Sequence, residues 1–169
     1  LVLSHGYPQV LAFGVGILVA LATAALNGVL VTRLKLPPFI VTLGTLNIFT
    51  ALSLIYAKGT TLSLKPDTFL TFTGKPITIG SFQLNWGVVI MLLLYVVFSY
   101  VLRQTAWGRH VYAVGDDPEA ARLAGIRTTR VLLSVYIVAG LVFAVAAWIY
   151  IGRLNGVDLH SSMSALNTV

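Results

Sequence analysis

The residues whose types and spacing could perform a specific task lie in one polar segment between two long apolar runs. Asp116 or Asp117 could cap the N-terminus of a helix, because a carboxylate there accepts hydrogen bonds from free backbone amides. Pro118 suits the first helical position, and Gly125 suits the left-handed residue that ends a helix. The pattern predicts a rod of about two turns, too short to be stable without a docking surface. Its residues are Asp116, Asp117, Pro118, Glu119, Ala120, Ala121, Arg122, Leu123, Ala124 and Gly125.

Two tasks are open to such a capped helix. One is a mechanical contact with a cytoplasmic partner protein, to which Glu119 and Arg122 would offer polar contacts around a small alanine surface. The other is that of an ordinary amphipathic helix resting on the bilayer surface. The local pattern fits both tasks equally well.

Patterns typical of catalysis are absent from the sequence. There is no Walker A glycine-lysine loop, no helical histidine pair and no serine elbow. His5, His110 and His160 do not cluster, and the chain has no cysteine. We therefore expect neither an enzyme nor a metal or cofactor site, and any ATP hydrolysis would have to come from another chain.

Composition indicates a membrane protein. Hydrophobic residues make up 57% of the 169 residues and charged residues only 9%, whereas soluble domains run near a quarter charged. The formal net charge of +6 lies mostly between apolar runs, where Lys and Arg orient helices and meet anionic lipid headgroups. No basic patch is interleaved with aromatic residues, so we expect no nucleic-acid partner.

Four apolar stretches are long enough, or nearly so, to cross the hydrocarbon core. They cover residues 10–31, 39–57, 86–102 and 131–151. A backbone in hydrocarbon must satisfy its own hydrogen bonds, so each stretch should be helical. The expected fold class is all-α, a polytopic transmembrane helix bundle. Because the first residue is Leu1 rather than Met, we expect a piece of a longer subunit.

The connections between these stretches predict an orientation. Residues 32–38 should form a tight turn, and residues 58–85 a turn-rich loop with room for a small hairpin around Ile77 to Ile79. Seven of the eleven Lys and Arg residues lie in connections 32–38 and 103–130, and four lie on the other side. The positive-inside rule therefore places the coupling loop, residues 103–130, in the cytoplasm.

Small residues recur every fourth position in the first apolar stretch. Gly16, Ala20, Ala24 and Gly28 would form one stripe along a helix, where a neighbouring backbone can approach closely. The neighbour could be another helix of the same subunit or a second copy. Either arrangement predicts a densely packed bundle.

Polar residues inside the stretches are few, and none is Asp, Glu, Lys, Arg or His. Asn27, Thr45 and Asn47 are the candidates for a translocation path, although hydrogen bonds between helices would also explain the two asparagines. Proton- or ion-coupled carriers usually need an ionisable residue at membrane depth. Its absence favours a permease whose energy comes from a separate ATPase.

Two segments carry a resemblance to a known family. Glu119-Ala120-Ala121 followed by Gly125 is similar to the coupling loop of bacterial ATP-binding-cassette importers. The hydrophobic-proline ending of the wider loop is absent, which favours the monosaccharide subgroup of ribose, xylose, arabinose and fructose permeases. The run from Asn27 to Thr45 resembles the helix–turn–helix of the same group, most closely its fructose-type members.

The resemblance implies a function and a set of partners. Residues 1–169 would form a single transmembrane permease domain in the bacterial plasma (inner) membrane, and residues 116–125 would contact an ATPase subunit. A second permease copy and a periplasmic sugar-binding protein would complete a monosaccharide importer. A secondary carrier or channel for a small polar solute is the alternative.

Overall fold

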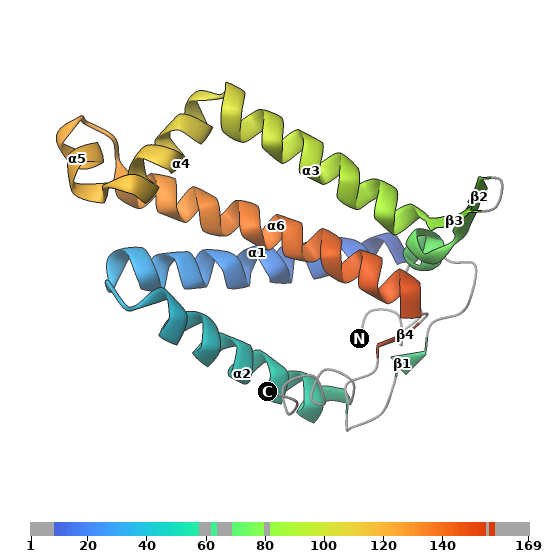
Figure 1. Ribbon diagram of the computed structural model, residues 1–169. Coiled ribbons are helices and arrows are strands. Elements are labelled where there is room, and N and C mark those ends of the chain that lie inside the picture. The colour runs from blue at the N-terminus through green and yellow to red at the C-terminus, as the bar shows by residue number, and fades with distance from the viewer. Residues whose placement is uncertain (1–8, 58–61, 64–68, 80–81, 155, 158–169) are drawn as a thin grey trace.

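The computed structural model describes residues 9–57, 62–63, 69–79, 82–154 and 156–157. Most of them are helical, and the elements run along a long, open arrangement of rods (Figure 1). The elements are α1 (Gln9–Arg33), α2 (Pro38–Ala57), β1 (Leu62–Ser63), η2 (Phe69–Gly74), β2 (Pro76–Ile79), β3 (Phe82–Asn85), α3 (Trp86–Gln104), α4 (Ala106–Asp116), α5 (Pro118–Leu123), α6 (Thr128–Leu154) and β4 (Gly156–Val157).

Four of these helices are long and apolar enough to cross a membrane. They are Val10–Arg33, Pro38–Tyr56, Trp86–Gln104 and Thr128–Arg153, and they match the four apolar stretches of the sequence to within a few residues at each end. The expected all-α, polytopic helical fold class is confirmed. The first turn is also as tight as expected, because α1 ends at Arg33 and α2 begins at Pro38, a residue that suits a first helical position.

Helices α1 and α6 pack closely against each other and form the centre of the described structure (Figure 1). A Cβ atom on Gly28 would lie 2.8 Å from Cδ1 of Leu133 and 3.0 Å from Cβ of Tyr136, so the two helices approach each other closely at this glycine. Gly140 of α6 likewise faces Ala20 and Ala24 of α1. The small-residue stripe therefore packs against protein of the same chain over most of its length. This contact is the closest helix packing between spans in the described part of the chain.

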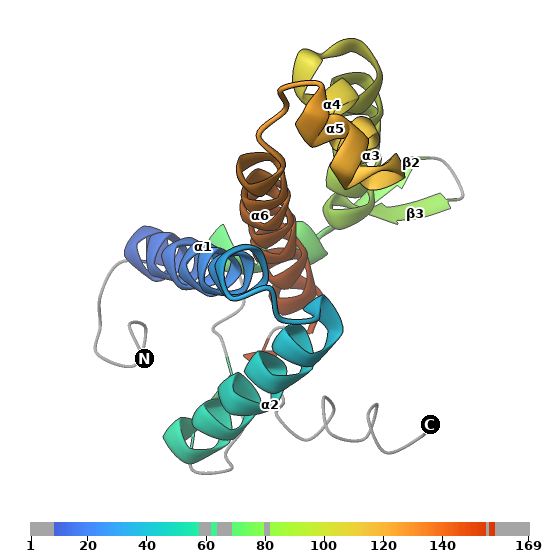
Figure 2. The same cartoon turned by 90° about the vertical axis from the view of Figure 1, so that its left-hand side faces the viewer.

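Helices α2 and α3 extend away from this central pair (Figures 1 and 2). Large side chains of α2 lie open, with Phe39 73% and Ile55 76% exposed. Gly16 at the near end of the α1 stripe and Gly44 of α2 also face open space, since a Cβ atom added to either would meet no atom within 4 Å. Such apolar surfaces are the ones that lipid or further helices cover in a membrane.

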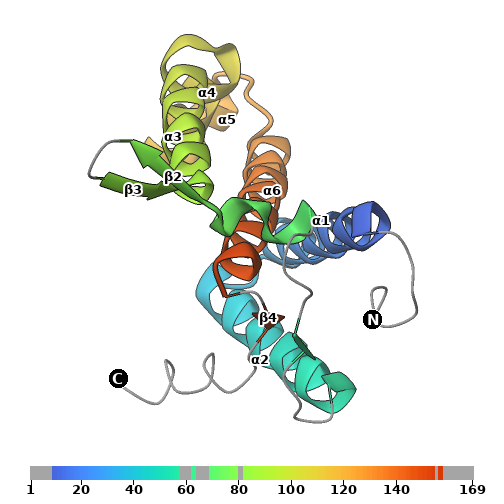
Figure 3. The same ribbon diagram turned by 90° about the vertical axis from the view of Figure 1, so that its right-hand side faces the viewer.

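The segment between α2 and α3 closes the end of the structure that lies opposite α5 (Figure 3). The expected hairpin is present: β2 pairs antiparallel with β3, with Ile77 opposite Leu84. The short helix η2, which the sequence did not predict, packs against α6. There Thr73 is 1% exposed, and its hydroxyl donates a 3.3 Å hydrogen bond to the carbonyl of Trp148. This contact holds the loop against the end of α6.

Candidate functional site

The short helix α5 has the capped N-terminus that its sequence predicts. Oδ1 of Asp117 accepts hydrogen bonds from the amides of Glu119, at 2.8 Å, and Ala120, at 3.0 Å. Pro118 occupies the first helical turn, where its missing amide costs nothing. Of the two aspartates that could have been the cap, Asp117 takes the role, and Asp116 is the last residue of α4.

The C-terminus of α5 is closed as well. Gly125 has a φ of 85°, in the left-handed region that favours glycine. The amide of Ile126 donates to the carbonyl of Ala121, and the amide of Gly125 donates to that of Arg122, both at 3.0 Å. This pair of bonds is the Schellman motif, which satisfies carbonyls that a helix end would leave free. A helix with both ends satisfied keeps its shape under load.

The outer surface of α5 differs in part from the alanine surface expected from the sequence. Ala121 is only 5% exposed, so it packs inward rather than facing a partner. Leu123 is instead 81% exposed, which makes it the most prominent apolar side chain of this helix. Glu119 and Arg122 do offer polar groups, and they form a 3.1 Å salt bridge with each other. The exposed face thus combines Leu123 with Ala120, Ala124 and an ion pair.

A helix that was not expected from the sequence supports α5. Helix α4 (Ala106–Asp116) lies between α3 and α5, and the sequence did not predict it. Nε1 of Trp107 donates a 2.8 Å hydrogen bond to Oγ of Ser134 in α6. The N-cap of α4 is Thr105, whose hydroxyl accepts from the amide of Gly108. Helix α4 therefore connects α5 to both α3 and α6.

A signal in the sequence could have revealed α4. Trp107, Val111 and Val114 recur at the spacing of one helix face, and all three are buried or half-buried in the structure. The residues on the other side, such as Arg109 and Tyr112, are exposed. Helix α4 is therefore amphipathic, and its apolar face packs against the neighbouring helices.

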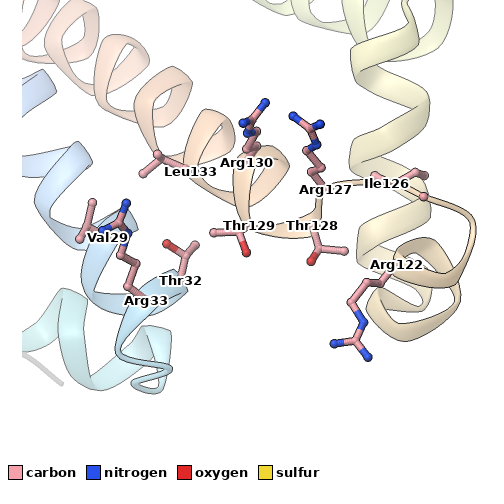
Figure 4. Close-up of a pocket in the computed structure, with 11 residues that line it drawn as sticks. Val29, Thr32, Arg33, Arg122, Ile126, Arg127, Thr128, Thr129, Arg130 and Leu133 are labelled. Carbon is pink, nitrogen blue, oxygen red and sulfur yellow. The ribbon is translucent and has the colours of Figure 1, made fainter.

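An open groove of about 680 Å³ lies between the end of α1, the loop after α5 and the start of α6 (Figure 4). Arginines and threonines dominate its walls, and none of its lining residues is acidic. From the sequence, the Lys and Arg residues between the spans were expected to orient the helices and to meet anionic lipid headgroups, and Arg122 was expected to contact a partner. The lining residues are Val29, Thr32, Arg33, Arg122, Gly125, Ile126, Arg127, Thr128, Thr129, Arg130 and Leu133.

The three candidate residues of a translocation path do not form one site in the described structure. Oδ1 of Asn27 is buried and has no hydrogen-bond partner among the described residues. Thr45 is buried and bonds to the carbonyl of Val41 in its own helix. Asn47 is exposed and donates to the carbonyl of Leu43, also in its own helix. A path through these residues remains a prediction.

Comparison with known proteins gives one family and several relatives. The family model described as "Branched-chain amino acid transport system / permease component" matches residues 1–169. The fructose import permease protein FrcC of Rhizobium meliloti is 45% identical over 158 residues, which cover 91% of this chain and 44% of that protein. The ribose import permease protein RbsC of Bacillus subtilis (strain 168) is 33% identical over 151 residues, 89% of this chain and 46% of that protein. The chain thus spans less than half the length of these relatives. No solved structure matches it.

Proposed function

The chain belongs to the family of branched-chain amino acid transport system permease components, and we propose on this premise that it forms part of the membrane subunit of an ATP-driven importer for a monosaccharide. It is a multi-pass protein of the bacterial inner membrane. Its relatives are permeases, which are not themselves enzymes. ATP hydrolysis on a separate subunit, a second permease copy and a periplasmic sugar-binding protein are parts of the proposal. The printed names of the relatives support a sugar as the substrate.

The observation that carries the proposal is the geometry of α5. A partner ATPase that closes on ATP must transmit its movement to the spans through a protein contact. Helix α5 is held at one end by Asp117 and at the other by Gly125, so it can transmit a push without unwinding. It projects at one end of the long helices, beyond the start of α6 (Figure 1). Residues 116–125 are therefore proposed as the coupling helix.

The route from α5 to the spans runs through α4. Ala121 is buried in the packing of α5 on its neighbours, chiefly α4. Helix α4 in turn contacts α3 and is bonded to α6 through Trp107 and Ser134. A displacement of α5 would therefore move α3 and α6 together rather than one span alone. Such linked movement is what a pore between rearranging spans requires.

Leu123 is the side chain of α5 best suited to enter an apolar cleft of the ATPase. Its side chain is 81% exposed, so the described residues cover little of it. Full burial of a leucine stabilises a contact by about 1.5–3 kcal/mol. The salt-bridged Glu119 and Arg122 beside it would form the polar rim of the contact.

The test compares two leucines on the predicted cytoplasmic side. Leu123→Ser in the complete permease should weaken ATPase binding by about 10- to 150-fold and abolish sugar uptake, since the apolar contact is lost. Leu34→Ser is the matched control: Leu34 is 62% exposed in the turn after α1 and lies outside α5. It should leave ATPase binding and uptake unchanged.

Two outcomes would contradict the proposal. Normal ATPase binding by Leu123→Ser would mean that α5 is a bilayer-surface helix. Sugar uptake by the permease without any ATPase would identify a secondary carrier or channel. If the proposal holds, calorimetry on the partner binding protein would identify the sugar that is carried.

A further inference from the structure

The groove between α1 and α6 combines positive charge with an apolar wall. Arg33 lies in the last turn of α1. Arg127 directly precedes α6, and Arg130 lies in its first turn. Val29 and Leu133 lie one turn further along the same two helices and line the inner part of the groove. A charged rim and an apolar inner wall complement a lipid, whose charged headgroup is joined to apolar acyl chains.

Three of the four arginines that line the groove have no acidic partner in the described structure. Arg122 is paired with Glu119, but no described salt bridge reaches Arg33, Arg127 or Arg130. The first turn of α6 contains no acidic residue, so the positive end of the helix dipole adds to the same field. An anion in the groove would relieve this concentration of like charge.

Figure 4 shows where these side chains lie along the groove. Arg127 and Arg130 extend to the same side of the start of α6, and the side chain of Arg33 lies beside Val29 on α1. All three are exposed, so their long side chains can turn toward a ligand. The hydroxyls of Thr128 and Thr129 can donate further hydrogen bonds to phosphate oxygens.

The depth of the groove in a membrane indicates the source of the anion. Arg33 is the last residue of one candidate span and Thr128 the first residue of another, so the groove lies where both spans leave the hydrocarbon. Lipid phosphates occupy that level, and basic pockets between spans are known to bind such headgroups. A free phosphate would use the arginines but would gain nothing from Val29 and Leu133.

We infer that this groove, formed by Arg33, Arg127 and Arg130 above Val29 and Leu133, binds the phosphate of an anionic phospholipid. The groove shares Arg122 and Gly125 with the proposed coupling helix, whereas Leu123 lies outside it. The groove also lies beside the loop from α5 to α6, so a bound lipid would steady the base of the coupling helix. The inference rests on the spans and the groove, not on which sugar is carried.

The experiment measures lipid binding by the complete, delipidated permease in the absence of its ATPase. Native mass spectrometry would compare phosphatidylglycerol with phosphatidylcholine of the same acyl chains. The double variant Arg33→Gln/Arg130→Gln should bind phosphatidylglycerol roughly 30-fold more weakly. This factor follows because each of the two lost basic groups contributes about 1 kcal/mol near an anionic membrane surface. The control Arg103→Gln/Arg109→Gln removes the same charge from two exposed arginines outside the groove and should bind normally.

Further arms distinguish the sources of the anion and guard against misfolding. The single variant Arg130→Gln should show a smaller loss in the same direction if the double variant fails to fold. Equal loss in the control pair, or no preference for phosphatidylglycerol, would overturn the inference. Displacement of the lipid by inorganic phosphate at equal concentration would identify a free-anion site instead. ATPase binding by the double variant is measured separately. If that binding is lost while lipid binding is unchanged, the groove contacts acidic side chains of the ATPase, and the inference is overturned.

Discussion

Gly125→Ala should damage the coupling helix through backbone conformation alone. The residue has a φ of 85°, and a side chain added there would meet no atom within 4 Å. Crowding therefore contributes nothing, and the effect is the cost of holding an L-residue in the left-handed region. That cost is about 1–2 kcal/mol per residue.

The chain provides a matched control in Gly115. A Cβ atom added to this glycine would also meet open space, but the residue lies in the last turn of α4, where its φ is not positive. Gly115→Ala adds the same methyl group at a position that an alanine adopts without strain. It should stabilise α4 by about 0.4–1 kcal/mol, because alanine has less freedom to lose from the unfolded chain. The two substitutions thus have opposite expected signs.

The assay is binding of the purified ATPase to each permease variant, measured by biolayer interferometry in detergent. In Gly125→Ala the C-terminal end of α5 should fray, and docking would have to restore its conformation. The free-energy cost of about 1–2 kcal/mol should therefore raise the dissociation constant about 5- to 30-fold. Gly115→Ala should bind at least as tightly as the unmodified permease. If both variants bind alike, the Schellman end of α5 is irrelevant to coupling and the reasoning fails.

Three further predictions concern the cap, the central packing and the orientation. Asp117→Ala should cost α5 about 0.5–2 kcal/mol and weaken ATPase binding, whereas Asp117→Asn should retain the cap, as pull-down titrations would show. Ala24→Leu should destabilise the permease by about 1–3 kcal/mol in thermal denaturation, because Ala24 faces Gly140. Ala22→Leu, on the exposed side of α1, should have little effect, and equal melting temperatures of the two variants would refute the packing. Thr78 and Thr129 are both exposed, and each would be replaced by a single cysteine. In intact cells an impermeant maleimide should label the cysteine at position 78 and not the one at position 129; labelling at position 129 would reverse the orientation.

The local elements follow from the sequence because local rules decide them. A charge-free apolar run in hydrocarbon has no alternative to a helix, so the four long helices were predictable from length and composition. The ends of α5 were also predictable, since Asp117 and Gly125 satisfy their caps within a few residues of the chain. The family resemblance depended on the same local segments.

What only the tertiary structure decided is where each face points. Nothing in the order of the alanines shows that Ala121 is buried while Leu123 projects, because that depends on how α4 lies across the start of α6. The groove likewise joins Arg33 to Arg130 across nearly a hundred residues of chain, and no spacing rule connects residues so far apart. The bond from Trp107 to Ser134 is of the same kind. The small-residue stripe of α1 marks a packing face in the sequence, but only the mutual packing of the helices decides that Gly140 of α6 lies against it.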